Sequence, residues 1–83
     1  MGKRLTRILI VADLEGSSAC WSYAASSFLT DEWAHACLGM SKDVSSVVGA
    51  LFDAGVKSVI VKDFHRSGYN LFAELIDARA RIV

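Results

Sequence analysis

Hydrophobic residues follow two kinds of pattern along the chain, short runs rich in β-branched residues and one long stripe with a helical period. Residues 7–12 (RILIVA) and 56–61 (VKSVIV) form two such runs. Runs of this kind are typical of strands in a parallel sheet, which are buried on both faces. Residues 79–83 (RARIV) begin in the same way and predict a third strand.

A long helix is predicted between the first two strands. Its apolar stripe consists of residues spaced mainly by three or four positions, namely Trp33, Cys37, Met40, Val44, Val47, Val48 and Leu51. Thr30 can cap the N-terminus of this helix, and Gly55 is a stop signal after its last turn. Gly39 and Ser41 leave open a division of the helix into two, because Ser41 is itself a good cap.

The remaining segment predicts a second helix and completes the fold class. Asn70 can cap a short helix over residues 71–78 (LFAELIDA). The order strand, helix, strand, helix, strand predicts an α/β fold with a parallel sheet of the three-layer α/β/α type. The 83 residues make at most one small domain, and three strands with two helices leave part of the sheet uncovered. We therefore expect residues 1–83 to be a single partial α/β domain, the N-terminal β-α-β-α-β part of a larger one, or a chain that needs a partner.

Composition and charge exclude several classes of protein. Nine basic residues balance nine acidic ones, and the sequence lacks the basic stripe of a nucleic-acid-binding protein. No stretch approaches the length of a membrane span, and the first apolar run is too short for a signal peptide. Cys20 and Cys37 lack a CxxC spacing and are expected to be reduced structural thiols. We therefore expect a cytoplasmic protein that binds neither nucleic acid nor membranes.

Apolar residues are unusually abundant for so short a chain, at 53%. This excess suggests apolar faces that another chain or further sequence would cover. Trp21, Tyr23 and Phe28 lie close together in the sequence, and core or interface packing explains them.

Polar side chains follow both of the first two strands. Asp13 and Glu15 come after the first strand, and Asp63 and His65 come after the second. The carboxyl ends of parallel strands meet at one edge of the sheet, where ligands bind in open α/β folds. Each pair is separated by one residue, so both members point the same way in extended backbone. The four side chains can therefore converge.

An imidazole among carboxylates suits zinc or manganese. A metal there would offset the repulsion between the acids and activate a water, which makes hydrolysis the natural reaction class. Two alternatives stay open: Asp13 could instead cap a turn, and Asp63 could orient His65 without binding metal. Glu32 and His35 have the spacing of a di-iron helix motif, but His35 falls off the apolar stripe and is expected to be solvated.

These motifs resemble the D-aminopeptidases of the DppA type. The stretch DLEG (residues 13–16) resembles the acidic motif after the first strand of that family, and VKDFH with the later NL (residues 61–71) resembles its second motif. The similarity extends in order over residues 7–83.

The resemblance implies a cytosolic, ring-shaped homo-oligomer with two zinc ions, which removes N-terminal D-residues from short peptides. It implies that Asp13 bridges the two metals and that Glu15 and His65 bind one of them. Asp63 and Asn70 match supporting positions near the site.

The family completes its site with a further histidine, a glutamate and a catalytic histidine, which have no counterpart in these 83 residues. The catalytic base is therefore unknown, and we expect the short chain alone to be inactive or incomplete. The alternative is a non-catalytic remnant or subunit that acts as an assembly or binding module.

Overall fold

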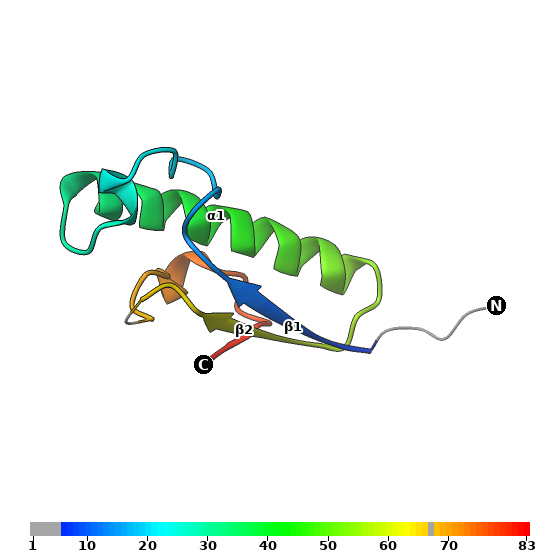
Figure 1. Cartoon of the computed structure of the whole chain (residues 1–83). Helices are drawn as coiled ribbons and strands as arrows, with labels where there is room; N and C mark the ends of the chain where they lie inside the picture. Colours follow the sequence, from blue (N-terminus) through cyan, green and yellow to red (C-terminus); the bar gives the residue numbers. More distant parts are fainter. Residues whose placement is uncertain (1–5, 67) are drawn as a thin grey trace.

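The computed structural model describes residues 6–66 and 68–83, which form a parallel three-stranded sheet with one long helix on one face (Figure 1). The strands β1 (Arg7–Ala12), β2 (Ser58–Asp63) and β3 (Arg81–Ile82) lie in the order β1-β2-β3. Both neighbouring pairs are parallel. The predicted α/β class with a parallel sheet is confirmed.

The register of β1 and β2 aligns their carboxyl ends. Arg7 pairs with Ser58, and Ala12 pairs with Asp63 at the other end. Asp63 is thus the last residue of β2, whereas the sequence predicted that the strand ends before it. The chain leaves both strands at the same level of the sheet, so the loops that follow lie next to each other.

The helix α1 (Asp31–Asp53) has the cap that the sequence predicted, because the side chain of Thr30 accepts a hydrogen bond from the backbone N–H of Trp33 at 3.0 Å. The helix runs without a break through Gly39 and Ser41, so the possible division is not observed. Gly39 has a different role: a Cβ there would collide with the backbone carbonyl of Ser18, so glycine lets the loop after β1 approach the helix.

The core lies between α1 and the sheet. Val59 and Val61 of β2 are buried in one cluster with Met40, Val44 and Val48 of the helix. Val47 was predicted on the same stripe but is 49% exposed, so the buried stripe is narrower than the sequence pattern.

The predicted second helix over residues 71–78 is wrong. This segment contains only the single 3-10 turn η2 (Ala73–Leu75). Its backbone is held by α1 instead: the N–H of Phe72 donates to Ser41 Oγ at 2.8 Å, and the N–H of Asp77 donates to Ser45 Oγ at 2.9 Å. In a helix over residues 71–78 the N–H of Asp77 would donate to the carbonyl of Ala73, so its bond to Ser45 replaces a helical one. The N–H of Phe72 lies in the first turn, where a helix has no backbone acceptor for it.

The third strand is shorter than predicted because a turn occupies its first residues. The carboxylate of Asp77 accepts hydrogen bonds from the backbone N–H, Nε and Nη2 of Arg79, and the Asp77 carbonyl accepts one from the N–H of Ala80. The strand therefore begins at Arg81.

The sheet face opposite α1 carries exposed apolar side chains. Leu9 and Val11 are 59% and 58% exposed, and Ile60, the register partner of Leu9, is half-buried. Within residues 6–66 and 68–83 no helix covers this face, so the third layer of the expected fold is not seen.

None of the helices in these ranges combines the length and the hydrophobicity that a membrane span requires. The cytoplasmic location stays a prediction.

Two adjacent valines of α1 provide a matched test of this packing. Val48 is fully buried, so Val48→Ala should lower the free energy of unfolding by about 2 kcal/mol through lost burial and the cavity it leaves. Val47→Ala makes the same chemical change on the exposed side and should be neutral or slightly stabilising, because alanine is the better helix former. Urea denaturation of both variants measures the difference. Equal destabilisation would contradict the placement of the core.

Candidate metal site

The loop after β1 presents two acids on its outer side. Leu14 is fully buried, whereas Asp13 and Glu15 on either side of it are exposed. The N–H of Leu14 donates to Asp13 Oδ1 at 2.7 Å, and Ser17 closes the turn by donating its N–H and hydroxyl to the Leu14 carbonyl. Gly16 permits this turn, because its φ of +85° lies in the left-handed region. The alternation expected from the sequence therefore places both acids on one side.

The loop after β2 delivers a buried histidine to these acids. The N–H of Phe64 donates to the carbonyl of Ala12 at 2.8 Å, so the pairing with β1 continues one residue beyond β2. Phe64 points outward and is 58% exposed, whereas His65 is only 4% exposed. Burial of a histidine at this position requires partners for both ring nitrogens.

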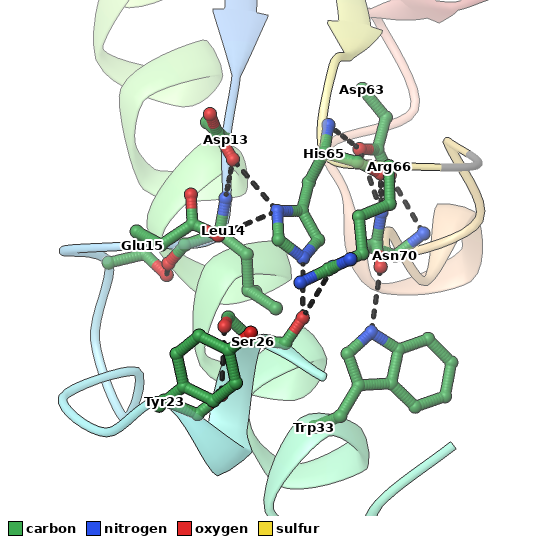
Figure 2. A network of polar contacts seen from close by, with 11 residues as sticks. Asp13, Leu14, Glu15, Tyr23, Ser26, Trp33, Asp63, His65, Arg66 and Asn70 are labelled. Atoms are coloured by element: carbon green, nitrogen blue, oxygen red, sulfur yellow. Dashed lines mark hydrogen bonds and ion pairs between the residues drawn. The ribbon is translucent and has the colours of Figure 1, made fainter. Parts of the chain in front are cut away.

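Both ring nitrogens of His65 have partners (Figure 2). Nδ1 lies 3.0 Å from Asp13 Oδ1 and 2.9 Å from Glu15 Oε1. Nε2 lies 2.9 Å from the backbone carbonyl oxygen of Ser26, at the end of the 3-10 turn η1 (Ala24–Ser26). One ligand atom from each of Asp13, Glu15 and His65 falls within 4.8 Å of the others.

The contact with Ser26 determines which nitrogen of His65 is free. A carbonyl oxygen only accepts hydrogen bonds, so Nε2 must carry the proton. In a neutral imidazole the lone pair of Nδ1 then faces two carboxylates, an arrangement that repels unless a second proton or a cation lies between them. A divalent metal ion fits this donor set, with the Nε2–H bond fixing the tautomer and the ring orientation.

A family model for D-aminopeptidases, peptidase family M55, matches residues 6–83. The chain belongs to this family of peptidases. Comparisons with curated proteins and with solved structures gave no match. The M55 match confirms the resemblance found in the sequence motifs. The three side chains that converge in the structure are the ones for which the resemblance implied metal binding.

Asp63 lies in the second loop, where its carboxylate is bonded to the backbone of that loop. Its Oδ1 accepts hydrogen bonds from the backbone N–H of His65 and from Asn70 Nδ2, both at 3.1 Å. Its Oδ2 accepts the backbone N–H of Asn70 at 2.7 Å. The carboxylate is therefore fully engaged with its own loop and lies outside the group of three converging side chains. This geometry favours the alternative that Asp63 orients His65.

Asn70 closes the same loop and does not cap a helix, contrary to the prediction. Its side chain is 2% exposed, and Nδ2 also donates to the carbonyl of His65 at 2.6 Å. The amide oxygen, which would accept in a cap, accepts from the Trp33 indole, and the turn η2 that follows begins after Phe72 without a side-chain cap.

Two other participants, the Ser26 carbonyl and Trp33, were not predicted. The Ser26 carbonyl accepts from His65 Nε2 and also from Arg66 Nε at 3.0 Å. A backbone carbonyl leaves no trace in the residue type, so no sequence pattern could have identified it. Trp33 donates its indole N–H to Asn70 Oδ1 at 2.7 Å. The only signal there was a tryptophan on a buried stripe, whose N–H needs a partner.

The pKa of Asp13 reflects its surroundings. Burial alone would raise it, but the N–H of Leu14 and the side chains of Glu15 and of His65, when Nδ1 carries the second proton, outweigh burial and lower the pKa below its ordinary value. The carboxylate is thus in the ionised form that metal binding requires.

The other candidate pair takes no part in the site. Glu32 and His35 are both exposed, as expected for His35. They line a surface hollow of about 310 Å³ beside Trp21. In the described part of the chain, the group formed by Asp13, Glu15 and His65 is the one with three metal-ligating side chains close together.

The two cysteines should be unreactive in the folded protein. Both are free and buried. Burial and the nearby charge of Asp63 raise the pKa of Cys37 to about 11.

A raised pKa keeps the thiol protonated, so iodoacetamide at pH 8 should modify Cys37 far more slowly than an ordinary thiol. The rate should keep rising up to about pH 11. Mass spectrometry measures the modification, and urea-unfolded protein is the control. Rapid labelling of folded Cys37 at pH 8 would contradict this environment.

Proposed function

We propose that this M55 chain contributes Asp13, Glu15 and His65 as zinc ligands to a D-aminopeptidase site that hydrolyses short peptides with an N-terminal D-residue. The observation that supports this most directly is the bond from His65 Nε2 to the Ser26 carbonyl. It turns the lone pair of Nδ1 toward both carboxylates, where a divalent cation offsets their charge.

Each ligand has a distinct part in the proposal. Asp13 would be the ligand shared by two zinc ions: its Oδ1 faces His65, while Oδ2 accepts no hydrogen bond from the described residues. Glu15 and His65 bind one of the two ions. When bound, zinc supplies Lewis-acid chemistry, since it lowers the pKa of a coordinated water to about 7 and polarises a carbonyl. No residue of this chain is assigned as the catalytic base.

Donors beyond these three would come from a larger domain, from a second copy or from a complementing chain. The sheet face that carries Leu9 and Val11 supports such an assembly, because these side chains are 59% and 58% exposed. Neither a nucleic acid nor a membrane is part of the proposal.

The same exposed face favours a second candidate, an assembly or binding module without catalytic activity. Apolar residues gathered on one sheet face are typical of an interaction surface. The two candidates differ in what zinc does, because the module requires no zinc-dependent hydrolysis.

The two histidines of the chain provide the test. Calorimetric titration of the metal-stripped chain with zinc should show saturable binding. His65→Ala and Asp13→Ala should each weaken it by at least about 100-fold, because each removes a ligand. The matched control His35→Ala should bind zinc like the wild type, because His35 is exposed on α1. Hydrolysis of a D-alanyl dipeptide, assayed in parallel, should require zinc.

A folded wild-type chain without zinc above background would refute the site, and full binding by Asp13→Ala would refute the bridging role. Zinc binding and self-association without hydrolysis of D-alanyl peptides would favour the module.

A further inference from the structure

The first turn of α1 reaches the loop that carries His65 through one side chain. Trp33 donates its indole N–H to Asn70 Oδ1 at 2.7 Å, and the two residues are 37 positions apart in the chain. Figure 2 shows the indole ring pointing from the helix toward Asn70. Asn70 is 2% exposed, so water has little access to this bond.

This bond adds to the two bonds of the amide nitrogen in holding the Asn70 amide in one orientation. An indole N–H only donates, so the group that meets Trp33 must be the amide oxygen. The amide nitrogen is then directed to Asp63 Oδ1 at 3.1 Å and to the His65 carbonyl at 2.6 Å. A flipped amide would place its oxygen against these two acceptors and its NH₂ against the indole N–H, and would lose all three bonds.

The correctly oriented amide fixes the backbone of His65 on both sides. Asn70 Nδ2 holds the carbonyl of His65, and Asp63, itself bound to Asn70, accepts the N–H of His65. The imidazole leaves this anchored backbone toward Asp13 and Glu15. A relay of hydrogen bonds thus leads from α1 to the backbone of His65, whose ring nitrogen Nδ1 faces the carboxylates.

We infer that Trp33 is a positioning residue for the metal ligand His65, acting through the Asn70 amide. The inference rests on the proposed zinc site and adds a residue on a separate element to it. Outer-shell partners of metal ligands typically change metal affinity by 10- to 100-fold. Trp33 is linked to His65 through Asn70, so we expect a loss of zinc affinity at the lower end of this range.

Trp33→Phe isolates the hydrogen bond from the packing. The Trp33 ring lies edge-on to Phe28 at a centroid distance of 4.9 Å, and a phenyl ring retains such a contact. The chain has one other tryptophan, Trp21, which is 90% exposed, so Trp21→Phe is the matched control. Zinc titration of the full chain should show about tenfold weaker binding for Trp33→Phe. Trp21→Phe should stay within about twofold of the wild type, as surface substitutions do.

A double-mutant cycle separates positioning from a general structural effect. If Trp33 acts only through Asn70, the double variant Trp33→Phe/Asn70→Ala should bind zinc as weakly as Asn70→Ala alone. Additive losses would overturn the inference, as would unchanged zinc affinity in Trp33→Phe.

Hydrogen exchange of the indole protons, followed by NMR on the wild-type chain, tests the relay without any metal or variant. The Trp33 indole proton should exchange much more slowly than that of Trp21. Equally fast exchange would overturn the inference. If the wild-type chain binds no zinc, both the proposed function and this inference are refuted. If the wild-type chain binds zinc and Trp33→Phe binds it equally well, only the inference is refuted.

Discussion

The candidate site depends on a buried imidazole with an acceptor at each ring nitrogen. His65 is 4% exposed, with the Ser26 carbonyl at Nε2 and the carboxylates of Asp13 and Glu15 at Nδ1. In a neutral ring the carbonyl fixes the proton on Nε2, which leaves the lone pair of Nδ1 able to bind a metal ion. With a neutral ring, this geometry brings a lone pair and two negative charges together, and either a second proton on Nδ1 or a cation relieves the repulsion.

Several elements contribute to holding this ring in place. The parallel register aligns the ends of β1 and β2, and η1 provides the carbonyl. The helix α1 provides Trp33, which holds Asn70 and through it the loop after β2. The M55 match covers all of these elements, since it extends over residues 6–83. The long helix thus has two roles, as the cover of the sheet and as an anchor for the site.

The sequence predicted the parts of this structure that follow from periodicity. Alternation placed Asp13 and Glu15 on one side, and the parallel strands brought His65 to them. In place of the helix expected over residues 71–78, the N–H of Asp77 donates to the Ser45 hydroxyl of α1 and not to the carbonyl of Ala73, a tertiary contact that no local pattern reveals. Asn70 was expected to cap that helix, but its amide oxygen accepts from Trp33 and its amide nitrogen donates within the His65 loop. Local propensity does not distinguish between such competing uses of one side chain.

The most direct test is the protonation pattern of the His65 ring in the zinc-loaded full chain, measured by long-range proton–nitrogen NMR correlation of the imidazole nitrogens. We predict a proton on Nε2, bonded to the Ser26 carbonyl, and a metal-bound Nδ1. A proton on Nδ1 with zinc on Nε2, or a ring unchanged by zinc, would contradict the account.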